Sequence, residues 1–109
     1  MSFISQRKAG EVGQGVNESR SYGFDFSALA ARFGTPTTVA YCYLYDETTG
    51  EDVSSSKLAG STNLNTTTYV GTSKRANAIL LDHDYTLVLG LNFPNSVILD
   101  SYITIHAQR

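Results

Sequence analysis

The feature that most constrains the fold of this chain is a two-residue alternation of side chains in several short segments. The strongest case is VAYCYLYD, residues 39–46, where Tyr41, Tyr43 and Tyr45 alternate with small or aliphatic residues. Successive side chains of a β-strand point to opposite faces of the sheet, so this segment predicts a strand with one aromatic face. The same alternation appears in residues 20–27 and 84–93. We therefore expect a chain built mainly from strands.

Further strand-like segments indicate the class of fold. Residues 66–72 and 76–82 are short and rich in β-branched or apolar residues, and residues 95–108 alternate with a change of phase that indicates a bulge near Asp100. Only residues 27–33, which a glycine follows, favour a short helix. About six or seven short strands, spaced roughly every ten residues, predict an all-β, immunoglobulin-like antiparallel β-sandwich. A small barrel is the alternative.

The N-terminal segment does not follow this alternation. Residues 5–21 are polar, contain three glycines and show neither a strand period nor a helix period. Ahead of them, Phe3 and Ile4 form a small apolar tip. We expect an extended N-terminal arm over residues 1–20 and a β-sandwich domain over residues 21–109. The arm is either a frayed terminus or a segment that orders against a neighbouring subunit through Phe3 and Ile4.

Size, charge and hydropathy limit the partners of the chain. A chain of 109 residues with 41% hydrophobic content fits one domain. Its net charge of -2 supplies no excess of cations for phosphates, so nucleic acid is not an expected partner. The longest apolar run, AILL at residues 78–81, is far shorter than the roughly 20 residues of a membrane helix, and MSFISQRKAG lacks a signal core. We expect a soluble protein made in the cytoplasm.

The sequence contains few candidates for catalysis. The single cysteine, Cys42, cannot form an internal disulfide, and we interpret it as a buried, inert thiol. LDHDY, which includes Asp82 and Asp84, reads as a turn between two apolar runs, and DETTGED at residues 46–52 reads as a charged hairpin turn. A hydrolase that uses Asp82 and Asp84 is the least favoured hypothesis. We expect no enzyme activity, no cofactor and no metal site.

The tyrosines of residues 39–46 are the candidate interaction residues. Tyrosine combines a large apolar area with a polar tip, so it is common at protein interfaces and also in half-buried strands. If Leu44 faces the core, then Tyr41, Tyr43 and Tyr45 form an exposed stripe that a partner can cover. If the tyrosines fill the core instead, Leu44 is exposed. The position of Leu44 distinguishes the two arrangements.

Several segments in order carry a family resemblance. They are RKAGE, YGFDFSALAARFGTPTTVA, YDETTGEDVSSSKLAGS, YVGTS, DYTLVL and YITIHA, and the linked run FDFSALAARFGTPTTV carries most of the weight. From about Lys8 to the end, the chain resembles a family of small structural proteins of tailed-phage virions. Ala9 stands where that family tends to have proline.

The resemblance implies an assembly role without catalysis. It implies a neck or tail adaptor that binds copies of itself and another virion protein, such as a portal, tail, fibre or capsid protein. A capsid decoration protein is the alternative within this class, and the protein would be located in the virion. A carbohydrate-binding β-sandwich module is the alternative from another class, because such modules often present aromatic rings to sugars.

Overall fold

The largest element of the fold is a five-stranded sheet. The computed structural model describes the backbone of residues 2–109 and the side chains of residues 8–109. The sheet has the strand order β1-β10-β9-β3-β4 and is antiparallel except between β1 and β10. Its strands are β1 (Ser2–Gly15), β10 (Val97–Gln108), β9 (Asp84–Phe93), β3 (Thr38–Asp46) and β4 (Glu51–Asp52). Since the described sheet ends at β1 and β4, it does not close into a barrel.

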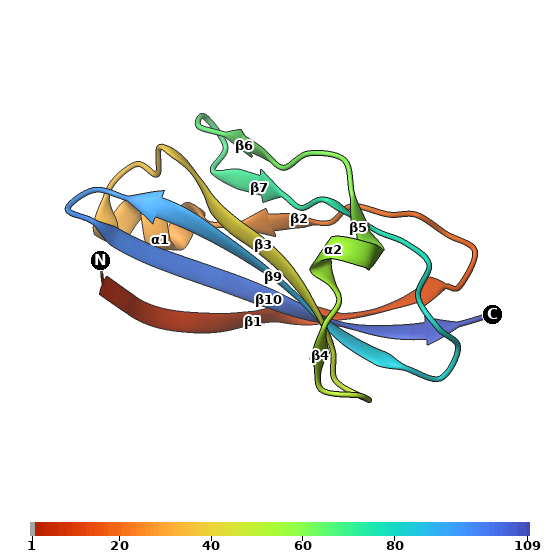
Figure 1. The fold of residues 1–109 in the computed structure, drawn as a ribbon. Coiled ribbons are helices and arrows are strands. Elements are labelled where there is room, and N and C mark those ends of the chain that lie inside the picture. Colours follow the sequence, from red (N-terminus) through yellow and green to blue (C-terminus); the bar gives the residue numbers. More distant parts are fainter. Residues whose placement is uncertain (1) are drawn as a thin grey trace.

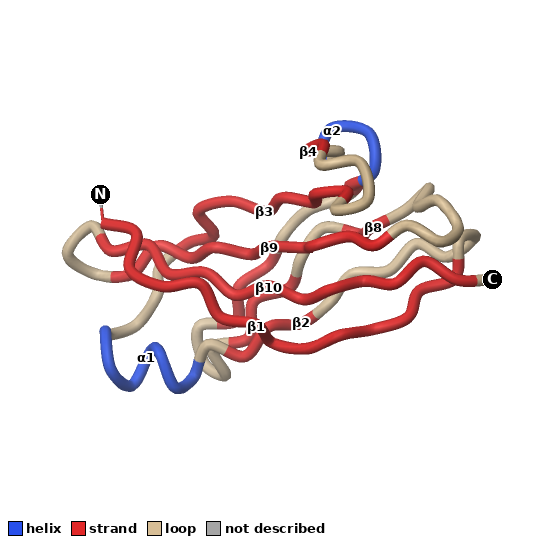
Figure 2. The backbone as a smooth tube through the Cα atoms, turned by 90° about the horizontal axis from the view of Figure 1, so that it is seen from below, coloured by secondary structure: helices blue, strands red, loops and turns tan. Residues whose placement is uncertain are grey.

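Smaller sheets and two short helices cover one face of the main sheet (Figure 1). One has the order β2-β7-β6, and the other pairs β5 with β8. The bounds are β2 (Gly23–Asp25), β5 (Leu58–Ala59), β6 (Asn63–Asn65), β7 (Val70–Thr72), β8 (Arg75–Ala76), α1 (Ser27–Phe33) and α2 (Ser54–Lys57). Figure 2 shows α1 and α2 near opposite edges of the strands. Helix α1 covers the residues predicted from the sequence and ends at Gly34, whose φ of 98° suits glycine.

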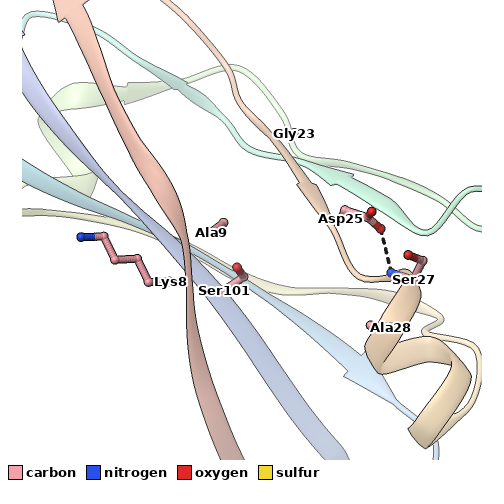
Figure 3. Close-up of a pocket in the computed structure, with 7 residues that line it drawn as sticks. All are labelled: Lys8, Ala9, Gly23, Asp25, Ser27, Ala28 and Ser101. Atoms are coloured by element: carbon pink, nitrogen blue, oxygen red, sulfur yellow. Dashed lines mark hydrogen bonds between the residues drawn. The ribbon is translucent and has the colours of Figure 1, made fainter.

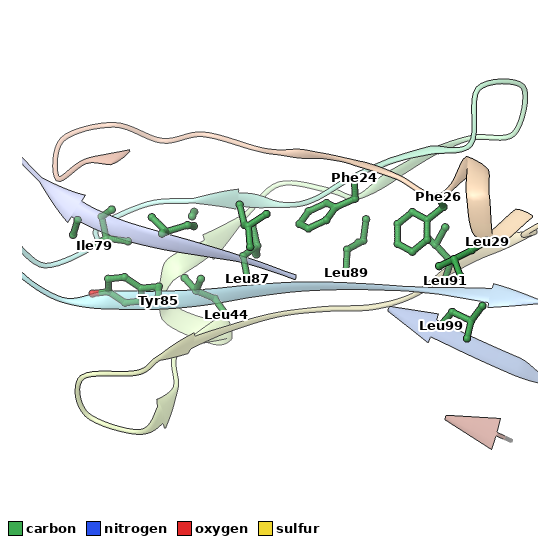
Figure 4. Close-up of a cluster of buried hydrophobic side chains, with 14 of the residues drawn as sticks. Phe24, Phe26, Leu29, Leu44, Ile79, Tyr85, Leu87, Leu89, Leu91 and Leu99 are labelled. Atoms are coloured by element: carbon green, nitrogen blue, oxygen red, sulfur yellow. The ribbon is translucent and has the colours of Figure 1, made fainter. Parts of the chain in front are cut away.

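The core lies between these two layers. Phe24 and Phe26 face leucines of β9, as Figure 4 shows, and β3 contributes Leu44. Leu87, Leu89 and Leu91 are fully buried, which follows from their two-residue spacing on the inward face of β9. Burying each such side chain contributes about 1.5–3 kcal/mol. The structure therefore confirms the predicted all-β sandwich.

The N-terminal segment, predicted as an extended arm over residues 1–20, is extended but lies within the main sheet of its own chain. Residues 2–15 form β1, which runs parallel to β10 along the edge of the main sheet (Figure 1). Backbone hydrogen bonds to β10 order this segment. A search for hydrophobic periodicity cannot detect such bonds, because they do not depend on the side chains. Val12 packs against the core and Gln14 is buried. Phe3 and Ile4 belong to β1 by their backbone, but their side chains lie outside the described residues.

The bulge predicted in the last strand is absent. Residues 97–106 of β10 pair with β9 without interruption, and the register shifts near Asp100 lie in β1, between Phe3 and Gln6 and between Lys8 and Gly10. The prediction was wrong because Ser101 is buried on the inward side of β10. Because Ser101 is polar, the apolar alternation of the sequence is interrupted at this position, although the strand itself continues without a bulge.

The strand predicted at residues 76–82 is also wrong. Only Arg75–Ala76 form a strand, β8, and the chain then turns. Ala78 and Asp82 have positive φ angles of 53° and 66°, which interrupt an extended conformation. Ile79 is nevertheless buried in the core. The apolar character of this segment reflects one buried side chain in a loop.

Candidate interaction surface

The structure decides which side of β3 faces outward. Leu44 is completely buried, whereas Tyr43 is 39% exposed and is flanked by half-buried Tyr41 and Tyr45. The ring centroids of Tyr41 and Tyr43 lie 5.0 Å apart in a stacked arrangement, and those of Tyr43 and Tyr45 lie 6.2 Å apart and are tilted. The tyrosines thus form a continuous aromatic stripe on the side of the sheet that faces away from the core. Cys42 points inward, and burial raises the pKa of its thiol.

The aromatic surface extends across the neighbouring strands. Val88 of β9 pairs with Tyr43 on one side and with Tyr102 of β10 on the other, so the three side chains share one face. Although it points away from the core, Val88 is only 3% exposed, because large side chains flank it. We call the surface formed by Tyr41, Tyr43, Tyr45, Val88 and Tyr102 the tyrosine face.

A buried carboxyl group holds one ring of the tyrosine face in place. The hydroxyl of Tyr41 donates a hydrogen bond of 2.6 Å to Oδ2 of Asp100, which is 1% exposed. The ring covers Gly90, where a Cβ would lie 2.4 Å from the Tyr41 ring. Burial raises the pKa of Asp100, although the bond from Tyr41 opposes this, and burial together with Asp100 raises the pKa of Tyr41. Tyr41 is therefore fixed before any partner arrives.

Charged groups border the tyrosine face at the β1 edge. Nδ1 of His106 lies 2.7 Å from Oδ1 of Asp84, and its Nε2 lies 3.1 Å from Oε1 of Glu11. These bonds raise the pKa of His106, the bond to Asp84 most strongly, and the bond from His106 lowers the pKa of Glu11. Nζ of Lys8 lies 3.6 Å from Glu11. The cluster links β1, β10 and β9 by their exposed side chains.

The residues of the LDHDY motif do not form a common site. Asp82 is an exposed turn residue, while Asp84 begins β9 and contacts His106. Nδ1 of His83 lies 2.7 Å from Oδ2 of buried Asp46. Burial raises the pKa of Asp46, but bonds from His83 and from two backbone amides outweigh this and lower it. This pair joins the β3–β4 hairpin to the start of β9.

A polar pocket lies on the other side of β1. It has a volume of about 390 Å³ and is bordered by Lys8 and Ala9 of β1, by β2, by the start of α1 and by Ser101 (Figure 3). Oδ1 of Asp25 accepts a hydrogen bond of 2.8 Å from the amide of Ser27 within the lining. The pocket lies where β2 and the start of α1 in the second layer come near β1 and β10 of the main sheet.

Neither a metal centre nor a membrane helix is found in the part of the chain that the structure describes. Within it, no group of three or more His, Cys, Asp and Glu side chains is arranged to hold a metal ion. No helix among these residues has the length and apolar character needed to cross a membrane. Comparison of the sequence with known proteins found no matching family model and no matching curated protein.

Sequence reasoning identified the three tyrosines of β3 but missed the rest of the tyrosine face. Tyr102 and Asp100 lie on the same side of β10, two residues apart, and an uninterrupted alternation would have placed them together. The inward Ser101 concealed that alternation. The sequence around Gly90 does not indicate its role, because only the cross-strand register places this residue under Tyr41.

Proposed function

We propose that this chain is a non-enzymatic structural protein of a tailed-phage virion, an adaptor at the neck or tail that binds neighbouring subunits through the tyrosine face. The family resemblance of the sequence supports the kind of particle. The orientation of β3 supports the choice of the tyrosine face as the binding surface. The observation that carries the proposal is that the ring of Tyr43 points outward while Leu44 is completely buried.

The make-up of the tyrosine face matches that of protein interfaces. The centre of an interface is typically aromatic and apolar, and its rim is polar. Here the centre contains four tyrosines around Val88, and Lys8, Glu11 and His106 lie at the β1 side. The bond from Tyr41 to Asp100 restricts one ring in advance, which reduces the entropy lost on binding. The face is therefore suited to a protein partner.

Complementation of a phage that lacks the gene tests this proposal. Cells supply either the wild-type chain or Tyr43→Ala, and purified particles are assayed for the protein and for infectivity. Loss of the exposed ring should reduce incorporation about tenfold or more, as expected for a residue at the centre of an interface. Tyr69→Ala, a half-buried tyrosine at the turn before β7, is the matched control. Normal incorporation of Tyr43→Ala would rule out this surface.

Labelling of the particles separates the adaptor from the decoration protein. An antibody against the purified chain should mark the neck or tail if the adaptor proposal is right, and the capsid surface if the chain is a decoration protein. Binding of a soluble glycan instead would support the carbohydrate-binding alternative. The mutual stacking of Tyr41 and Tyr43 argues against that alternative, since each ring covers part of the other.

A further inference from the structure

The outer edge of β1 is open over a short run of backbone. The amide of Val16 donates to the carbonyl of Gln108 at 2.8 Å, whereas the amide of Gly15 donates to the Glu18 carboxylate at 2.7 Å. Backbone groups of successive strand residues point to alternate sides, so Glu11 and Gly13, like Gly15, direct theirs away from β10. Within the described residues, the Glu18 carboxylate bonds to the amide of Gly15, whereas no side chain bonds to the backbone of Glu11 or Gly13. The Gln108 side chain lies over the face of Gly13, where a Cβ would point, and not at the strand edge. This edge can accept another strand.

We propose that β1 pairs antiparallel with β1 of a second copy of this chain, with Lys8 of each copy opposite Glu11 of the other. The facing strands are centred between Ala9 and Gly10, and the main sheet continues from one copy into the next. A two-fold axis perpendicular to the sheet relates the copies, so every contact occurs twice.

Charge complementarity selects this partner and this register. Lys8 and Glu11 pair with Tyr102 and Thr104 of β10, so both side chains lie on the outer face of the sheet. Because the antiparallel arrangement exchanges their positions between copies, each lysine meets a glutamate. A lysine on an edge strand opposes pairing with unrelated strands. In the register described, Glu11 of the second copy neutralises the charge of Lys8. A strand without a carboxylate at that position would leave the lysine unpaired, so a second copy is favoured over other strands.

The centre of the proposed contact allows close approach. Ala9 and Gly10 have small side groups, and a Cβ built at Gly10 meets no atom within 4 Å. The register shift between Lys8 and Gly10 places Ala9 at an irregularity of β1. Both copies carry this irregularity at the centre of the pairing. The two-fold axis therefore places the irregular segment of one strand opposite the irregular segment of the other.

Pairing through β1 would orient both tyrosine faces in the same direction. A two-fold axis perpendicular to the sheet keeps the outer faces of both copies on one side. Two linked faces bind a repetitive partner more tightly than one, because the second contact forms at a high effective concentration. This consequence rests on the proposed adaptor function, whereas the pairing itself concerns the isolated chain.

Charge reversal with sedimentation equilibrium tests the pairing on the purified full-length protein. Lys8→Glu places like charges opposite each other at both symmetric contacts, and Glu11→Lys does the same. Each single variant should raise the dimer dissociation constant by at least about tenfold. The double variant Lys8→Glu/Glu11→Lys restores opposite charges across the axis and should restore dimerisation. Lys8 also lies 3.6 Å from Glu11 of its own chain, so the two single variants are mixed as well. In that mixture only contacts between copies bring opposite charges together, and a mixed dimer should form.

Two controls separate the pairing from unrelated effects. Glu51→Lys makes the same charge change as Glu11→Lys on β4, at the opposite edge of the main sheet, and should leave the dimer intact. Glu11→Lys also removes a carboxylate that contacts His106, so Lys8→Glu is the primary variant. Circular dichroism of each variant verifies the fold.

The outcomes distinguish this pairing from the proposed function. A wild-type chain that stays monomeric at all concentrations, or a dimer that neither reversal weakens, would overturn the pairing. If the pairing fails while Tyr43→Ala blocks incorporation into particles, the adaptor proposal stands alone. If the dimer responds as expected while Tyr43→Ala is incorporated normally, only the adaptor proposal fails.

Discussion

Gly90 illustrates how a single residue controls the outer face of the main sheet. A Cβ at this position would lie 2.4 Å from the Tyr41 ring, so the ring occupies the space that a side chain would take. The hydroxyl of the same ring donates the hydrogen bond to buried Asp100. The position of Tyr41 therefore depends on the absence of a side chain on the neighbouring strand.

Replacement of Gly90 by alanine should destabilise the protein. The added Cβ displaces the Tyr41 ring and removes the hydrogen-bond donor from Asp100, which costs about 1–3 kcal/mol of unfolding free energy for a buried acceptor left unsatisfied. Urea unfolding measures this loss. Tyr41→Phe keeps the ring but removes the hydroxyl, and it should cause a similar loss. Unchanged stability in both variants would contradict the role of this contact.

The attachment of β1 shows how an element that is poor in apolar residues is held to the sheet. Gln14 donates from Nε2 to the carbonyl of Ala76 at 2.7 Å and accepts from the hydroxyl of Tyr22 at 2.6 Å. On the outer face, His106 joins Glu11 to Asp84. Polar contacts on both faces therefore supplement the backbone bonds between β1 and β10.

The contacts of His106 with Asp84 and Glu11, here called the His106 cluster, should make the attachment of β1 dependent on pH. The pKa of His106 is raised above its ordinary value of 6.5, so its contribution to stability is complete below about pH 6.5. That contribution is lost as the pH rises through the raised pKa. The pKa of Glu11 is lowered from 4.5, so its contribution is present above about pH 4.5 and is lost on acidification through the lowered pKa.

Comparison of the wild type with His106→Gln tests this dependence. The difference in unfolding free energy between the two proteins should be largest between about pH 4.5 and 6.5, and it should decline as the pH rises further. The protection factors of the amides in residues 10–15, which are corrected for the intrinsic rise of exchange with pH, should fall over the same upper range. A difference that stays constant from pH 5 to 9 would show that the cluster does not contribute through protonated His106.

The whole molecule depends on how closely its two layers approach. Gly71 of β7 lies over the main sheet, and a Cβ there would lie 2.7 Å from Cδ2 of Leu89 on β9. Phe24 and Phe26 fill the space on the same side of β9 (Figure 4). The spacing between the layers is therefore set by a residue without a side chain opposite a fully buried leucine.

Gly71→Ala should separate the layers or distort Leu89. Overpacking of this kind typically costs about 1–3 kcal/mol, which urea unfolding can measure. Leu89→Ala leaves a cavity and costs about 2–5 kcal/mol. Because the added methyl group occupies part of that cavity, the double variant should lose less stability than the two single variants combined. Additive losses would indicate that the layers do not meet at this pair.

The amino-acid sequence by itself determined the class of fold, the extents of β3, β9 and α1 to within a residue, and the candidate tyrosines. Those features depend on the periodicity of neighbouring residues, which the order of side chains records directly. It did not determine the pairing of β1 with β10, the turn at residues 77–83 or the inward position of Ser101. Each of these depends on backbone hydrogen bonds or burial supplied by distant segments.

The tertiary structure alone decided how the tyrosine face is assembled. The alternation in residues 39–46 left either side of β3 free to face the core, and the burial of Leu44 against the second layer resolved this. Only the register of three strands brings Tyr102 into the face and places Gly90 and Asp100 next to Tyr41. A local pattern specifies which side chains share a face of one strand, whereas packing between layers specifies which face is buried.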